Sequence, residues 1–289
     1  MKQHLFRTTL LAVAGTAIIS SSVKAQSATT YGQGDFLLGF RATGGQGAAS
    51  NVLVDLGNGS VAAVDAASSA GTPLTFNIAN LFSTLNAVYG NNWTTRSDVF
   101  FSVAGAHATT NSTIYITAPE MVGGSEATPW NGLGSSSQTG VRNKMNTEGG
   151  LPNSSGYNHY ITNTNPNGAG AAVIEGQTDT NSYGSYMPGG TTANAGAAGI
   201  SYAQFNPTIE GTFANGTGGI TLDLIKLTTA TGTGPGQDLG DFTISNSGVL
   251  TFTPDISEVP EPGTYAGAIL AAGVVVAMTI GRKKSFVGS

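Results

Sequence analysis

Residues 34–56 read GDFLLGFRATGGQGAASNVLVDL, and this stretch decides the fold class of the chain. It contains two short apolar runs, residues 36–40 and 52–54, separated by Gly44-Gly45-Gln46-Gly47. Apolar runs of this length on either side of a glycine-rich segment are typical of two antiparallel strands joined by a loose turn. The stretch therefore predicts a β-hairpin near the start of the folded part of the chain.

Further strands follow the same logic. Residues 99–103 and 113–117 are rich in β-branched and aromatic side chains, and residues 220–224 alternate apolar with polar. A closing hairpin is expected in which Phe242 and Ile244 pair with Leu250 and Phe252 across residues 246–248, whose Asn-Ser-Gly sequence suits positive φ. The chain is therefore predicted to be mainly β, with a β-sandwich or jelly-roll-like exported domain. No internal repeat is visible, which argues against a solenoid or propeller.

One short amphipathic helix is expected among these strands. Apolar side chains recur at helical spacing from Leu81 to Tyr89, Asn77 is a candidate N-cap, and Gly90 is a candidate stop. These signals predict a helix over residues 77–89. Between residues 118 and 199 the pattern breaks up, and only short strands and one further helix near residues 139–145 are expected there.

The N-terminal 25 residues have the organisation of a signal peptide. Lys2 and Arg7 form a basic region, residues 10–19 are apolar, and small residues flank Lys24. We expect signal peptidase to cleave between Ala25 and Gln26. The apolar run is too short to span a bilayer, although an uncleaved anchor is the alternative.

The C-terminal residues 259–289 contain a candidate membrane anchor. Residues 264–281 carry no charge, and Arg282, Lys283 and Lys284 follow as a stop-transfer cluster. As a helix these roughly 18 residues would span about 27 Å, close to the hydrocarbon core of a bilayer. The basic cluster predicts a cytoplasmic tail, with the body on the other side of the inner membrane.

Pro260-Glu261-Pro262 lies just before the helix and is held extended by its two prolines. A plain C-terminal tether and a buried core helix are the alternatives.

The order of Pro260-Glu261-Pro262, an apolar helix over residues 264–281 and the basic residues 282–284 resembles the PEP-CTERM sorting signal of Gram-negative bacteria. The resemblance implies that a membrane-embedded exosortase recognises and processes the chain, after a transient stay in the inner membrane. It also implies delivery to the cell surface or extracellular matrix, with exopolysaccharide as an associated partner.

Three segments of the body, which spans residues 26–258, also resemble PEP-CTERM surface proteins. They are residues 34–41, residues 92–98, and residues 239–243 together with 248–252. These similarities imply a β-rich exported domain and no catalytic site.

The charge of the body limits its partners. Residues 26–261 contain five Lys and Arg and sixteen Asp and Glu, so this exported part carries a net charge of −11. Such a surface repels nucleic acid and anionic lipid. The chain has no cysteine, so its stability must come from packing, ions or partners instead of disulfides.

The residues of the body indicate little catalytic chemistry. His107 and His159 are far apart in the sequence, and without cysteine or a His-Glu-x-x-His motif they predict neither a metal site nor a cofactor. No Gly-x-Ser-x-Gly elbow or Walker loop is present. Paired carboxylates leave a glycoside hydrolase open, although no pair is singled out. Residues 234–241 resemble one calcium-binding turn, and we favour an ordinary acidic loop there.

The sequence therefore favours a non-enzymatic surface or matrix protein that is an exosortase substrate. The alternatives are a secreted carbohydrate-active enzyme and a carbohydrate-binding module carrying the same sorting tail.

Overall fold

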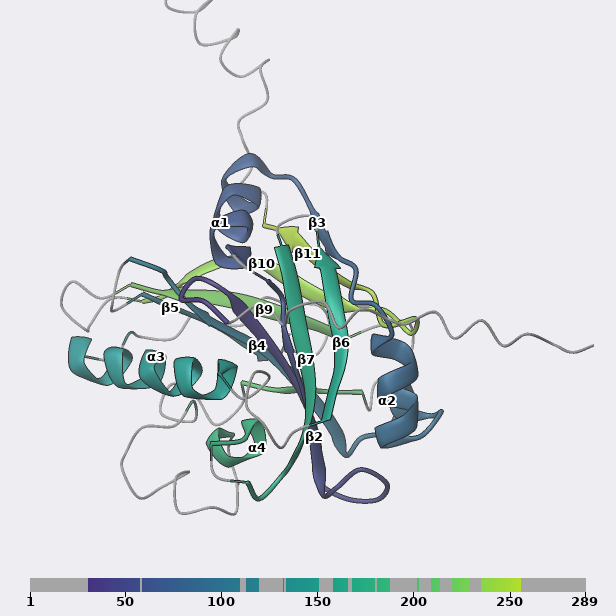
Figure 1. The fold of residues 1–289 in the computed structure, drawn as a ribbon. Coiled ribbons are helices and arrows are strands. Elements are labelled where there is room, and N and C mark those ends of the chain that lie inside the picture. The colour runs from purple at the N-terminus through teal and green to yellow at the C-terminus, as the bar shows by residue number, and fades with distance from the viewer. Residues whose placement is uncertain are drawn as a thin grey trace, which may run out of the picture.

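The computed structural model describes residues 31–57, 59–109, 113–119, 132, 134–150, 158–165, 168–179, 181–187, 202, 209–213, 220–228 and 235–255. Eleven strands in these ranges form one antiparallel sheet (Figure 1). Ten of them follow one another in the order β3 (Leu74–Phe76), β11 (Leu250–Pro254), β10 (Gln237–Ile244), β9 (Ile220–Leu227), β5 (Ile114–Pro119), β4 (Val99–Ala106), β1 (Phe36–Ala42), β2 (Ser50–Asp55), β7 (Gly168–Gly176) and β6 (Asn158–Asn165). The short strand β8 (Gly211–Thr212) pairs with β4.

The mainly β prediction is confirmed, but the described strands do not divide into the two separate sheets of a sandwich. Backbone pairing is continuous from β3 to β6, because β9 pairs with β5 and β4 pairs with β1. A wide antiparallel sheet twists, and the accumulated twist curls this one around its own apolar face (Figure 1). A single half-barrel thus encloses the core that a sandwich would hold between two sheets.

The predicted hairpins have the expected partners. Phe40 lies opposite Val52 in the first hairpin, and Phe242 lies opposite Phe252 in the last one. The second predicted strand pair is β4 with β5, where Ala104 lies opposite Ile116. Gly248 in the last turn has a φ of 80°, a conformation that favours glycine. The sequence thus predicted these strand pairs correctly, and for the closing hairpin it also predicted the pairing of Phe242 and Ile244 with Leu250 and Phe252.

The inner face of the curled sheet is apolar. Phe36, Phe40 and Phe242 project into it, and the rings of Phe36 and Phe242 lie 5.7 Å apart in an edge-on contact. The helices α1 (Ser60–Ala70) and α2 (Leu81–Tyr89) contribute buried side chains to the same cluster. Trp93, in the 3₁₀ turn η1 (Trp93–Thr95), is fully buried. These elements exclude water from the half-barrel.

The number and limits of the helices differ from the prediction. The helix expected over residues 77–89 begins at Leu81, because Asn80 takes a left-handed conformation with φ of 62° and ends the preceding turn. Three further helices are present, α1, α3 (Ser135–Gly149) and α4 (Tyr183–Tyr186), of which the sequence predicted only the middle of α3. The glycines on either side of α1, Gly59 and Gly71, both have positive φ and delimit that helix.

The segment 92–98 has a structural role. The Arg96 guanidinium donates hydrogen bonds to the carbonyl oxygens of Gly44, Gln46 and Tyr89, at 2.8, 2.8 and 2.6 Å. It also forms a bidentate ion pair with Asp98, at 2.9 and 2.7 Å. Arg96 thereby links the β1–β2 loop to the end of α2 through hydrogen bonds.

Replacing Leu85 with Asp should destabilise the fold strongly. Leu85 is fully buried in the inner cluster, so the substitution places a carboxylate in an apolar core. We expect a loss of at least about 3 kcal/mol and a melting temperature roughly 10 °C lower, measured by circular dichroism. Phe82→Asp on the same helix is the control, because Phe82 is 41% exposed and should tolerate the change better. Equal effects of the two substitutions would show that α2 does not pack on the sheet through Leu85.

Candidate functional site

The residues predicted to direct sorting lie outside the described residues. This holds for the cleavage residues Ala25 and Gln26, for the motif 260–262 and for the basic residues 282–284. In the part of the chain that the structure does describe, no helix is long and apolar enough to cross a membrane. The predicted helix over residues 264–281 belongs to the other part, so it stays a prediction.

The two histidines of the body lie at different places in the sheet, His107 directly after β4 and His159 in β6. The Nδ1 atom of His107 accepts a hydrogen bond from the amide of Thr109 at 3.2 Å, and the backbone of His159 belongs to β6. Within the described ranges, no group of three or more histidine, aspartate or glutamate side chains is placed to hold a metal ion.

The acidic segment in the first half of β10, where the sequence resembles a calcium-binding turn, has a structural explanation. Gly240 has a φ of 127°, and a Cβ atom there would lie 2.2 Å from the carbonyl oxygen of Thr253. The carboxylate of Asp238 accepts a hydrogen bond from the Gly240 amide at 3.2 Å, and the pairing of β10 with β9 shifts register between Asp238 and Asp241. Glycine at position 240 is thus required by a β-bulge.

The largest concentration of buried polar groups lies on the outer face of the sheet, opposite the apolar core. Arg41 of β1 lies directly opposite Asn51 of β2, and Asn51 lies opposite Glu175 of β7. Phe100 of β4 continues this row, with the Arg41 guanidinium 5.5 Å from the centre of its ring. We call Arg41, Asn51 and Glu175 the polar row. All three are buried, so each needs partners from the layer above.

Helix α4 supplies part of that layer through Tyr183. Its ring lies on Gly39, where a Cβ atom would come within 2.1 Å of it, so only glycine permits this contact. The Tyr183 hydroxyl lies 2.8 Å from the Ser102 hydroxyl and donates to Glu210 at 2.9 Å. The amide of Tyr183 donates to the Glu175 carboxylate at 2.6 Å. One residue of α4 thereby contacts four positions around the polar row.

Glu210 neutralises the charge of Arg41. The Arg41 Nε atom donates to both carboxylate oxygens, at 2.8 and 3.0 Å, and the Nη2 atom forms a further short contact. The two side chains are only 7% and 5% exposed. Burial alone would lower the pKa of Arg41, but the hydrogen bonds and charge of Glu210 outweigh burial and raise it. Arg41 therefore stays charged.

Two buried glutamates lie on this side of the sheet. Burial raises the pKa of Glu175 to about 8, although the Tyr183 amide and Asn51 act in the opposite direction. Burial also raises the pKa of Glu148, at the end of α3, well above its usual range, and Glu148 accepts a hydrogen bond from Tyr202. Burial therefore favours the protonated form of both carboxyl groups.

The partners of the polar row connect α4 to the sheet. Ser102, Tyr183 and Glu210 form a chain of hydrogen bonds, in which Ser102 and Tyr183 are only 1% and 2% exposed.

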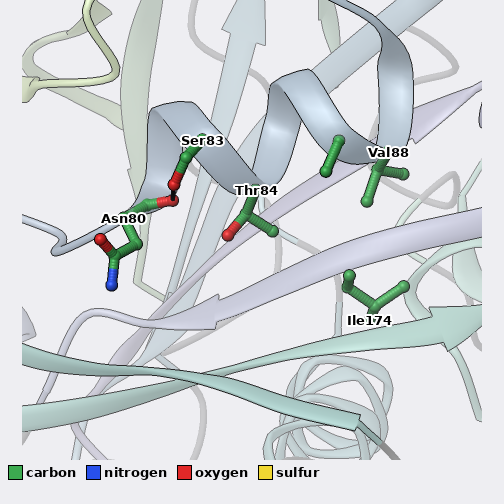
Figure 2. Close-up of a pocket in the computed structure, with 6 residues that line it drawn as sticks. Asn80, Ser83, Thr84, Val88 and Ile174 are labelled. Atoms are coloured by element: carbon green, nitrogen blue, oxygen red, sulfur yellow. Dashed lines mark hydrogen bonds between the residues drawn. The ribbon is translucent and has the colours of Figure 1, made fainter. Parts of the chain in front are cut away.

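A groove lies elsewhere, between α2 and the sheet (Figure 2). Its volume is about 450 Å³, within the size range of ligand sites. It is lined by α2 and by one side chain of β7, namely by Asn80, Ser83, Thr84, Ala87, Val88 and Ile174. Hydroxyl and amide groups lie at one end and aliphatic groups at the other (Figure 2). These six residues include no carboxylate, so the groove suits binding of a small neutral ligand better than acid–base chemistry.

The sequence did not identify either arrangement. Arg41 and Glu210 are separated by 169 positions, and nothing local connects them. The groove residues of α2 recur at helical spacing, which could have indicated a second face on that helix.

Stability of the protein should fall as pH rises from about 5 to about 8. In this window the folded state holds protons on Glu175, and on Asp55, whose pKa burial raises to about 7, while the unfolded chain releases them. Each pKa unit corresponds to about 1.4 kcal/mol, so denaturant unfolding at pH 5, 6.5 and 8 should resolve the trend. The Glu175→Gln variant has a side chain of the same shape that does not titrate, so the stability of this variant should depend less on pH. A wild-type stability that rises over this range would contradict the buried, protonated state.

Comparisons of this chain with protein-family models, with curated proteins and with solved structures found no match. What the protein does must therefore be inferred from its own residues.

Proposed function

We propose that this chain is a non-enzymatic protein of the cell surface or extracellular matrix, exported through a cleaved signal peptide and sorted as an exosortase substrate. Residues 264–281 hold it briefly in the inner membrane, with the body in the periplasm. Processing near Pro260-Glu261-Pro262 then releases it, and exopolysaccharide is its associated partner outside the cell.

One observation carries this proposal, namely the order of elements at residues 260–284. A Pro-Glu-Pro tripeptide, an uncharged stretch and three cations follow one another without interruption. A plain tether would need the last two elements only. The two prolines restrict the backbone of the tripeptide, which suits a charged segment that a protease binds.

The body supports a structural role. The segments that resemble PEP-CTERM proteins contain Asp35, Arg96 and Gly240, and each of these residues fixes a loop. The Asp35 carboxylate accepts hydrogen bonds from the backbone amides of Gly32 and Gly59, both at 2.7 Å. The side chains in these segments thus maintain the fold.

Replacing Glu261 with Ala should block maturation without affecting membrane insertion. The carboxylate lies outside the apolar stretch, so its removal costs the anchor nothing, while a charge-assisted hydrogen bond to the processing enzyme is lost. Uncut precursor should accumulate in the inner membrane, whereas the wild type should be shorter and outside the cell. Immunoblots of the membrane and extracellular fractions measure both.

Glu258→Ala is the matched control, because it removes the same charge three positions before Glu261 and outside the motif. It should mature normally. If the wild type keeps its C-terminal tail in cells that contain an exosortase, the sorting proposal is wrong.

A carbohydrate-binding module is the second candidate, and the groove beneath α2 is the observation that favours it. Hydroxyl and amide groups beside aliphatic side chains match the hydroxyls and apolar faces of a neutral sugar. A glycoside hydrolase would need two carboxyls about 5 to 9.5 Å apart at the site. Binding without cleavage is therefore the better alternative.

Filling the groove tests this candidate. Ala87→Trp places a large ring among the lining residues, so it should abolish co-sedimentation with exopolysaccharide if the groove binds sugar. Ala62→Trp, at an exposed position of α1, should leave binding unchanged. Release of reducing ends would indicate the enzyme instead, and no binding by the wild type would favour a structural role.

A further inference from the structure

The groove beneath α2 contains a nearly buried hydroxyl group that lacks a partner in the described part of the chain. Thr84 lines the groove and is only 8% exposed. Its backbone amide donates to the carbonyl oxygen of Asn80 at 2.9 Å, but its hydroxyl forms no hydrogen bond with any residue that the structure describes (Figure 2). Buried polar groups in folded proteins nearly always have a partner. The Thr84 hydroxyl therefore indicates a partner that enters the groove.

Two more polar groups lie at the same end of the groove (Figure 2). The Ser83 hydroxyl donates to the carbonyl oxygen of Asn80 at 2.9 Å, which leaves its own oxygen as an acceptor. The Asn80 side chain is exposed and carries both an amide donor and a carbonyl acceptor. This end of the groove thus offers hydrogen-bond donors and acceptors without a charge.

The other end of the groove is aliphatic and has two walls. Ala87 and Val88 belong to α2, and Ile174 of β7 lies across from Val88 (Figure 2). The six lining residues include no aromatic ring, which is the side chain that best covers the flat face of a sugar. Two aliphatic walls suit a compact group such as a methyl, because it contacts side chains on both sides.

We propose that the ligand of this groove is a neutral N-acetylated sugar whose acetamido methyl group lies between Val88 and Ile174. The acetamido C=O and N–H groups and the adjacent ring hydroxyls pair with Thr84, Asn80 and Ser83. The proposal rests on the carbohydrate-binding candidate function and names the ligand class for it.

Other common classes of sugar leave one end of the groove unsatisfied. A uronic acid finds no cation among the lining residues and is repelled by the net charge of −11 on residues 26–261. A free amino sugar carries an ammonium group, which would lose water at a site without a carboxylate. An unsubstituted hexose is neutral, but it has no methyl group for the aliphatic end. An N-acetylated sugar has a group that matches each end.

Ligand-detected NMR titrations of the full chain test the ligand class. The probes are N-acetylglucosamine, N-formylglucosamine and glucose. Burial of one methyl group is worth about fourfold in Kd, so the N-formyl sugar should bind about fourfold more weakly than the N-acetyl sugar. Glucose also lacks the amide hydrogen bonds and should bind at least about tenfold more weakly. Saturation transfer from the protein should be strongest at the acetyl methyl protons.

Thr84→Val tests the buried hydroxyl, because valine has nearly the same shape and cannot form hydrogen bonds. Its Kd for N-acetylglucosamine should rise by about three- to tenfold. Its melting temperature should not fall, since the hydroxyl has no partner among the described residues. Thr75→Val, at an exposed position of β3, is the matched control and should leave the Kd unchanged.

Equal Kd values for N-acetylglucosamine and glucose, or stronger saturation transfer to the ring than to the methyl protons, would overturn the ligand class while the groove remained a sugar site. Equally tight binding of Nε-acetyl-lysine would show that the groove selects an acetamido group without a sugar, and would also overturn it. Binding of no sugar at all, together with no co-sedimentation with exopolysaccharide, would reject the carbohydrate-binding function itself.

Discussion

The ion pair between Arg41 and Glu210 determines how the outer layer of this protein is built. Every residue of β1 is buried, so the strand has no solvent on either side, and a charge on it must be neutralised within the fold. Glu210 neutralises this charge and lies directly before β8 in the sequence. The same carboxylate accepts a hydrogen bond from the Tyr183 hydroxyl. Removing one partner of a buried pair leaves an uncompensated charge, at a cost of about 3–5 kcal/mol. The pair therefore ties α4 and β8 to the centre of the sheet.

The polar row also fixes strand register, which the apolar inner face cannot do alone. Phe36, Phe40, Val52 and Val54 could slide by two positions and still face an apolar core. A one-residue slip of β1 would turn Arg41 into that core, and any slip would separate Asn51 from Glu175. Buried polar groups stabilise less than apolar ones of the same size, but they penalise the wrong arrangements more. The outer face also buries a second apolar cluster, which includes Leu37, Leu53 and Val173, so the polar row adds specificity of register to a face that apolar packing also stabilises.

The sequence predicted those elements whose signals are local. Phe242 and Phe252 pair as expected because period-two patterning and the turn at Gly248 lie within a few residues of each other. The sequence analysis did not predict α1. The buried face of this helix consists mainly of Val61, Val64 and Ala67, and the rest of the helix is mostly alanine and serine, so its apolar periodicity is weak. In α3 the only large apolar residues are Val141 and Met145, so packing against the sheet imposes a helix that local propensity does not favour. The curled single sheet depends on pairings such as β9 with β5, which lie far apart along the chain.

The scarcity of charge in this chain has a consequence for its surface. Only 9% of its residues are charged, and six of these, Asp35, Arg41, Asp55, Glu148, Glu175 and Asp223, are buried. What the body presents to its surroundings is then dominated by hydroxyl, amide and backbone groups, with a thin excess of negative charge. Such a surface discriminates partners through hydrogen bonds and shape, because it has few cations for steering anionic ligands. The residues that line the groove beneath α2 are likewise uncharged, so any ligand there would be held by hydrogen bonds and shape instead of charge.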